Sequence, residues 1–148
     1  MTIKRLLIAN RGEIASRIIS SAHDMGISCV AIYTEADKDT PYVREADQAF
    51  KLSDSYLNSK EILDIALNSN SDAIHPGYGF LSENAAFANQ VKKLNIKWVG
   101  PSSNAIKKMG DKLTAKEIAI KANVPTLPMT SDPKKANSIG YPILCLLY

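Results

Sequence analysis

The segment 75–84, HPGYGFLSEN, gathers several groups that can bind a ligand. Pro76 precedes two glycines that lie two residues apart, which predicts a tight loop with its backbone open to a ligand. Tyr78 lies between these glycines and offers a flat ring and a hydroxyl group. His75 is a candidate base, although a histidine at a strand end is more often a hydrogen-bonded structural group. Glu83 is expected in the first turn of a helix, where its charge suits the helix dipole.

The lysine of MGDK, at 109–112, is a candidate for binding phosphate. Lys112 is expected at the start of a helix, directly after a break at Gly110. A cation is unfavourable at a helix N-terminus unless an anion lies nearby, so this placement indicates a phosphate. Lys108, Lys112 and Lys116 are spaced by four residues and form either a basic stripe or a solvated surface. The glycine break favours the solvated surface.

The segment 10–17, NRGEIASR, has the position of a nucleotide-binding turn but lacks its composition. A dinucleotide fingerprint has three glycines, GxGxxG, because only glycine lets the backbone approach the pyrophosphate closely. Here Gly12 stands alone, which argues against NAD binding at this turn. The structural alternative is a strand–turn–helix in which Asn10 and Glu13 cap the start of the helix.

Cysteine and histidine do not show the spacing of a metal site. The two cysteines, Cys29 and Cys145, lie far apart, and no CxxC pair exists. The two histidines, His23 and His75, do not complete a zinc site. We expect no bound metal and two buried, reduced thiols.

Composition places the chain among ordinary globular proteins. A length of 148 residues suggests about one domain, and 45% hydrophobic residues suffice for a core. The 22% of charged residues excludes a disordered acidic chain, and two cysteines exclude a disulfide-stapled miniprotein. The net charge of +3 gives no indication of nucleic-acid binding.

No targeting segment is visible in the sequence. The amino terminus, MTIKRLLIANRGE, lacks the apolar length and the cleavage site of a signal peptide. No run approaches the ~20 apolar residues that span a membrane. We therefore expect a cytoplasmic protein, or one of an organelle matrix in a eukaryote, with no membrane partner.

Short apolar runs alternate with helical patterns along the first hundred residues. We expect strands at 6–9, 29–33, 49–52, 72–74 and 96–99. This alternation predicts an α/β fold with an open, mostly parallel, Rossmann-like sheet and helices on both faces. Ligands of such sheets bind beyond the carboxyl ends of the strands, so the residues directly after each strand matter most. The segment 75–80 is one of these.

Capping residues predict where the helices begin and end. Gly26 is expected to stop a helix with its apolar face at Ile14, Ile18, Ala22 and Met25. Further caps are expected at Asn58 (with Glu61), Ser82, Asp111 and Asp132. After residue 101 the pattern changes to helices, which predicts a domain at 1–101 and, at 102–148, a short helical linker with the start of a further domain.

The chain resembles the N-terminal domain of biotin carboxylase, the ATP-grasp component of biotin-dependent carboxylases. The matching segments, in chain order, are LIANRGEIASRI, AIYTEAD, SYLN, AIHPGYGFLSEN, WVGPSSNAIKKMGDK, NVPTLP and IGYPI. They extend from about Lys4 to Leu144, nearly the whole chain. HPGYGFLSEN and MGDK are the most specific of them.

The resemblance implies ATP- and bicarbonate-dependent carboxylation of biotin. In this family bicarbonate attacks the γ-phosphate of Mg-ATP, and the resulting carboxyphosphate yields CO2 that biotin captures. The resemblance implies that Lys112 contacts ATP and that Tyr78 and Gly79 lie along the biotin-facing side of the active site. It also implies a biotin carboxyl carrier protein or domain and a carboxyltransferase component as partners, and a homodimeric full-length form.

The sequence departs from the family pattern at its end. IGYPIL is followed by CLLY, where the family has a strand with an ATP-binding lysine and then a glycine-rich lid. We therefore expect a chain that is truncated before the ATP-grasp domain and inactive alone. Two alternatives stay open, namely another ATP-grasp ligase of the carbamoyl-phosphate or purine type, and a non-catalytic interaction or dimerisation module.

Overall fold

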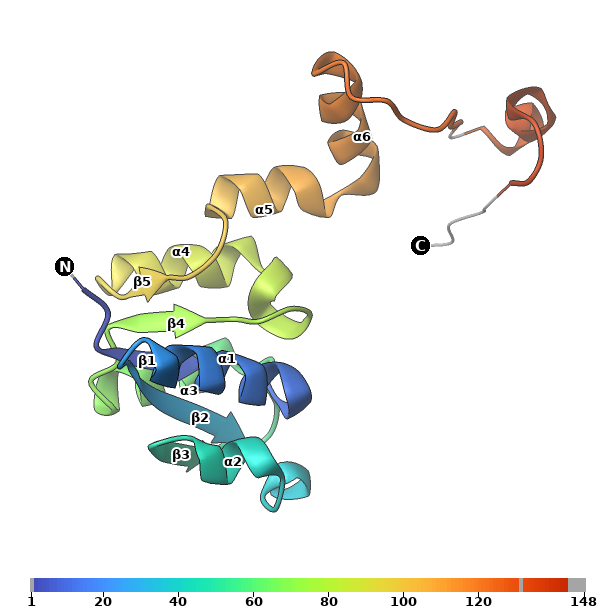
Figure 1. Ribbon diagram of the computed structural model, residues 1–148. Coiled ribbons are helices and arrows are strands. Elements are labelled where there is room, and N and C mark those ends of the chain that lie inside the picture. The colour runs from blue at the N-terminus through green and yellow to red at the C-terminus, as the bar shows by residue number, and fades with distance from the viewer. Residues whose placement is uncertain (1, 131, 144–148) are drawn as a thin grey trace. The chain divides into compact units, whose positions relative to one another are not determined.

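The computed structural model describes residues 2–130 and 132–143. The chain divides into two compact units, Met1–Gly110 and Asp111–Tyr148. The first unit contains the sheet with its covering helices (Figure 1). Among the described residues, no helix is long and apolar enough to cross a membrane.

Five parallel strands form the sheet of the first unit, in the order β3-β2-β1-β4-β5. Their bounds are β1 Arg5–Ile8, β2 Ser28–Tyr33, β3 Gln48–Lys51, β4 Ala73–His75 and β5 Lys97–Trp98. Leu7 of the central strand pairs with Val30 on one side and with Ile74 on the other. The open parallel α/β sheet expected from the sequence is confirmed, and each strand lies within about two residues of its expected bounds.

Helices cover both faces of this sheet. They are α1 Gly12–Asp24, α2 Pro41–Glu45, α3 Ser59–Asn68, α4 Ala85–Lys93 and α5 Ser103–Gly110, with 3-10 turns η1 Glu35–Asp37 and η2 Phe80–Glu83. Leu6 and Ile8 face α1 and α2, whereas Leu7 faces α3 and α4. This alternation arises because successive side chains of a strand point to opposite faces.

Two of the expected helix boundaries are confirmed in detail. Gly26, at φ +70°, donates its N–H to the carbonyl of His23, and Ile27 donates to that of Ala22, which together form a Schellman motif. Asn58 accepts a hydrogen bond from the N–H of Glu61 at 3.2 Å, and its side-chain amide donates to the Glu61 carboxylate at 3.0 Å.

Two other expectations about helix boundaries are wrong. Met25 is 74% exposed, because α1 has already ended at Asp24 and the Schellman turn carries Met25 away from the sheet. Ser82 lies within η2, and Asn84 caps α4 by accepting the N–H of Phe87 at 2.9 Å. The 3-10 turn that follows HPGYG delays the start of the α-helix by two residues.

The second unit contains α6 Lys112–Lys121 and the 3-10 helix η3 Pro133–Ile139. Asp111 caps α6 through the N–H of Thr114 at 2.7 Å, and Asp132 caps η3 through the N–H of Lys134 at 3.0 Å, as expected. The domain boundary at 101/102 stays a prediction, although Ile106 of α5 is buried in the core of the first unit. Cys145 and the rest of CLLY lie outside the described residues.

Leu7→Ala should destabilise the fold far more than Leu67→Ala. Leu7 is fully buried on the central strand, so truncation leaves a cavity, and we expect a loss of about 2–5 kcal/mol. Leu67, on α3, is 47% exposed, and its truncation should cost less than about 1 kcal/mol. Urea unfolding followed by circular dichroism measures both, and equal losses would contradict the assignment of β1 to the centre of the core.

Candidate functional site

The HPGYG loop leaves the sheet at its carboxyl edge, beside the end of the central strand. His75 is the last residue of β4, and β4 pairs in parallel with β1. The N–H of Ala9 donates to the carbonyl of His75 at 2.9 Å, which continues this pairing one residue beyond β1. The next residue, Asn10, therefore lies against the loop, as the ligand rule for open parallel sheets predicts.

Asn10 holds the loop through both hydrogens of its side-chain amide. Its Nδ2 donates to the carbonyl of Pro76 at 2.7 Å and to that of Tyr78 at 2.8 Å, and the residue is 2% exposed. Its Oδ1 accepts the N–H of Arg11 at 2.9 Å. The buried amide of Asn10 thus links two carbonyls of the loop, and the one of Pro76 is itself bound at a buried position.

The expectation that Asn10 and Glu13 cap α1 is wrong. The N-cap residue is Arg11, and no side chain makes the capping hydrogen bond. The amide of Asn10 is used by the loop after β4, and the carboxylate of Glu13 accepts a hydrogen bond from the Tyr78 hydroxyl. Both side chains that local sequence assigned to the helix end therefore bind a segment more than sixty residues away.

The two glycines of the loop have different surroundings. Gly77 has φ +63°, and a Cβ placed there would lie 2.7 Å from Nδ2 of Asn10. Gly79 has φ +65°, but a Cβ there would meet no atom within 4 Å. Gly77 is thus needed for the close approach of Asn10, whereas the space beside Gly79 is open to a ligand.

Tyr78 presents its ring to solvent while its hydroxyl is engaged. The residue is 57% exposed, and its hydroxyl donates to the Glu13 carboxylate. This bond raises the pKa of Tyr78, because the phenol must stay protonated to donate to an anion. The side chain therefore offers a ligand an exposed aromatic face and a fixed, neutral hydroxyl.

His75 is a hydrogen-bonded part of the loop. Its Nδ1 accepts the N–H of Gly77 at 3.0 Å. Burial lowers the pKa of His75, and the charge of Arg17 lowers it further. Both effects favour the neutral ring that this hydrogen bond requires, as the structural interpretation of His75 predicts.

A buried polar network that the sequence analysis missed lies at the same edge of the sheet. Asp37 is 5% exposed, accepts the Tyr56 hydroxyl at 2.6 Å and pairs with the Arg11 guanidinium at 2.9 Å. The Tyr42 and Tyr56 hydroxyls lie 3.0 Å apart, and burial raises the pKa of both phenols. The segment AIYTEAD contains this aspartate, but nothing local indicates that it is buried. The network braces Arg11, the neighbour of Asn10.

Lys112 is the first residue of α6, at a helix start after the break at Gly110, as expected. It belongs to the second unit, and the structure describes it separately from the loop of the first unit. Of the lysines spaced by four, Lys116 donates to the carbonyl of Leu127 and so has a structural contact within that unit.

Gly77→Ala should cost more stability than Gly12→Ala, although both glycines have φ +63°. An alanine at Gly12 meets no atom within 4 Å, so its cost is the left-handed conformation alone, about 1–2 kcal/mol. At Gly77 the clash with Asn10 adds about 1–3 kcal/mol. Urea unfolding measures both variants. In an Asn10→Ala background the excess should shrink, and an unchanged excess would show that this contact is not its cause.

Comparison with known proteins agrees with this geometry. The family model described as biotin carboxylase, N-terminal domain, matches residues 2–106. Biotin carboxylase 1 of Bacillus subtilis is 48% identical over 155 aligned residues, which cover 96% of this chain and 34% of that protein. The biotin-dependent acyl-coenzyme A carboxylase alpha3 subunit of Mycobacterium leprae is 49% identical over 90% of this chain and 23% of its own length.

A solved structure shows the same fold. The biotin carboxylase domain dimer of the 2-oxoglutarate carboxylase of Hydrogenobacter thermophilus, in complex with MgADP, ADP and bicarbonate, matches 96% of this chain with a TM-score of 0.88 and 41% identity. The match covers 34% of that chain, so the present sequence spans about a third of these biotin carboxylases. The chain therefore belongs to the family of biotin carboxylase N-terminal domains.

Proposed function

We propose that this chain supplies the N-terminal part of a biotin carboxylase, which uses ATP and bicarbonate to carboxylate biotin on a carrier protein or domain. The observation that carries this proposal is the match over 96% of the chain to a biotin carboxylase domain solved with MgADP and bicarbonate. The 41% identity in that match supports a shared reaction in addition to the shared fold.

In this proposal Tyr78 and Gly79 face biotin. The exposed ring of Tyr78 supplies an apolar surface, while the hydroxyl stays bound to Glu13. The open space beside Gly79 lets a ligand approach the backbone without meeting a side chain. Asn10 positions both residues because it fixes the carbonyls of Pro76 and Tyr78.

We propose that Lys112 binds a phosphate of ATP. It opens α6, where the backbone N–H groups and the helix dipole already favour an anion. An ammonium group at this position adds a charge-assisted hydrogen bond to the phosphate. The neighbouring Asp111 carboxylate is held by the N–H of Thr114, so it serves as a helix cap.

Magnesium does not fit the residues around the HPGYG loop. Within 2–130 and 132–143, the one group of three or more possible metal ligands is His23, Cys29 and Asp47. These residues lie at the other edge of the sheet, and they are not an all-oxygen set of the kind that Mg2+ prefers. We therefore assign no step of the reaction to a magnesium ion held by these residues.

The proposed partners follow from the same reaction. A carrier protein or domain brings biotin, and a carboxyltransferase component uses the carboxybiotin. The related domain of Hydrogenobacter thermophilus is a dimer, which supports a homodimeric full-length form. Relatives named for pyruvate, methylcrotonoyl-CoA and other acceptors match this same segment, so we place the choice of acceptor outside it. The proposed compartment is the cytoplasm, or an organelle matrix in a eukaryote.

Lys112→Ala should impair the use of ATP and spare that of biotin. The test enzyme is a chimera in which this chain replaces the matching segment of the Bacillus subtilis relative. Loss of a charge-assisted phosphate contact worth about 1.5–3 kcal/mol raises the KM for ATP roughly tenfold or more. Lys112→Arg should restore only part of the loss, because a planar guanidinium does not replace a compact ammonium.

The matched control for Lys112 is Lys121→Ala, which removes an exposed lysine from the other end of α6. This variant should leave both KM values unchanged. An unchanged KM and kcat for ATP in Lys112→Ala would overturn the assignment of Lys112.

A polypeptide of these 148 residues alone should release no phosphate from ATP in the presence of magnesium, bicarbonate and free biotin. Phosphoryl transfer needs several fixed charges acting on the transferring group together, and the described residues supply one candidate lysine. The chimera serves as the positive control in the same phosphate-release assay. Biotin-stimulated turnover by the polypeptide alone would contradict this expectation.

A further inference from the structure

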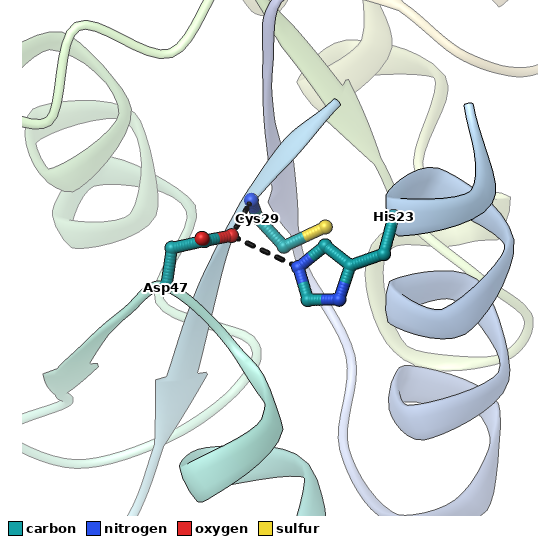
Figure 2. A group of neighbouring side chains, drawn as sticks. All are labelled: His23, Cys29 and Asp47. Atoms are coloured by element: carbon teal, nitrogen blue, oxygen red, sulfur yellow. Dashed lines mark hydrogen bonds and ion pairs between the residues drawn. The ribbon is translucent and has the colours of Figure 1, made fainter. Parts of the chain in front are cut away.

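Three side chains from separate elements meet at the amino edge of the sheet. His23 lies in the last turn of α1, Cys29 is the second residue of β2, and Asp47 directly precedes β3 (Figure 2). Because α1 starts after the carboxyl end of β1 and runs back along the sheet, its last turn returns to the amino ends of the strands. This cluster is thus at the opposite end of the strands from the HPGYG loop.

The three possible ligand atoms lie close together. Nε2 of His23 and Oδ2 of Asp47 lie 3.0 Å apart, and the same carboxylate oxygen accepts the N–H of Cys29 at 2.7 Å. The sulfur, the imidazole nitrogen and the carboxylate oxygen all lie within 4.8 Å of one another. Figure 2 shows the Asp47 carboxylate directed at the Cys29 backbone nitrogen and at the His23 ring, with the sulfur on the side of that ring.

From this convergence we propose that His23, Cys29 and Asp47 form a binding site for one zinc ion. Tetrahedral zinc, with bonds of about 2.0–2.3 Å, holds its ligand atoms roughly 3.3–3.8 Å apart. To reach this range the His23 nitrogen and the Asp47 oxygen, now 3.0 Å apart, must part by a few tenths of an ångström. The sulfur, which lies within 4.8 Å of both, must approach them by up to about 1 Å.

The donor set favours zinc over the other common divalent cations. Thiolate, imidazole and carboxylate are the three ligand types of protein zinc sites. Magnesium and calcium prefer oxygen ligands throughout, and the buried sulfur excludes them. One thiolate and one carboxylate together balance the charge of a dication, so the occupied site is neutral.

The scaffold holds the ligands in place before any metal arrives. Cys29 is fully buried on a strand that is paired on both sides, and its backbone N–H fixes the carboxylate of Asp47. The side chains of His23 and Asp47 are 41% and 48% exposed, so an ion can meet these two ligands first and reach the buried sulfur by a small movement of their side chains. Solvent can fill the remaining coordination position on that side.

Metal binding replaces protons at this site. The thiol proton passes to solvent as the sulfur–zinc bond forms, and His23 binds as the neutral imidazole through Nε2. Without metal, burial raises the pKa of the Cys29 thiol to about 11, with the Asp47 charge adding to this shift. The metal-free thiol is therefore protonated and unreactive. The exposed His23 imidazole and Asp47 carboxylate are then paired with each other.

Local sequence does not reveal this site, and the proposal revises the expectation of no bound metal. The ligands at 23, 29 and 47 match no metal motif because they come from three elements that only the fold brings together. Zinc here would join the end of α1 to the starts of β2 and β3. The proposal does not depend on the proposed carboxylase activity.

The test uses the 148-residue polypeptide with Cys145→Ser, so that Cys29 is the sole thiol. Calorimetric titration with Zn2+ should show one equivalent bound per chain. Titration with Co2+ should produce a thiolate-to-cobalt charge-transfer band in the near-ultraviolet. A hundredfold excess of Zn2+ over its Kd should raise the Tm by about 5–10 °C, and a chelator should reverse the rise.

Variants of the exposed ligands test the assignment of each residue. His23→Gln and Asp47→Asn should each lower the affinity for Zn2+ at least tenfold, whereas Asp24→Asn, on the same helical turn, should leave it unchanged. Cys29→Ser should abolish the cobalt band. If that buried variant does not fold, the two exposed variants suffice to test the site. Absence of stoichiometric binding, an undiminished affinity in both exposed variants, or a cobalt band that survives Cys29→Ser would overturn the proposal.

Discussion

The side-chain amide of Asn10 is the interaction on which the candidate site depends. Its two hydrogens bind carbonyls of Pro76 and Tyr78, and this is possible only because β1 and β4 are neighbours in a parallel sheet. The same contact leaves no room for a side chain at residue 77. The shape of the loop and the glycine within it therefore share one cause, and that cause lies at the end of a different strand.

The two ends of the parallel strands in the first unit carry different chemical groups. At the carboxyl edge lie the loop, the Tyr78–Glu13 contact and the buried Asp37 network, all formed by residues that follow strands. At the amino edge lie Cys29 and Asp47 with the returning end of α1. The HPGYG loop, with its proposed biotin-facing residues, and the proposed metal site thus lie at opposite ends of the same strands. We therefore expect that each can be altered with little effect on the other.

The sequence predicted what depends on local pattern and missed what depends on distant partners. Apolar runs located the strands, and Gly26 and Asn58 located helix ends, because these features are decided within a few residues. Asn10 was assigned to a helix cap, since its true partners are 66 and 68 residues away and no local signal names them. Asp37 was missed for the same reason, because its burial depends on Tyr56 and Arg11.

The two outer strands of the sheet determine whether folded copies of this unit can pair edge to edge. β3 has four residues and β5 has two, and each carries an exposed lysine, Lys51 and Lys97. Another chain pairs with a strand edge through a long row of unpaired backbone N–H and C=O groups. A short edge strand exposes few such groups, and a lysine on it opposes pairing by its charge. The sheet of the first unit is thus protected at both sides against growth by strand addition, a route to aggregation that leaves the packed core intact.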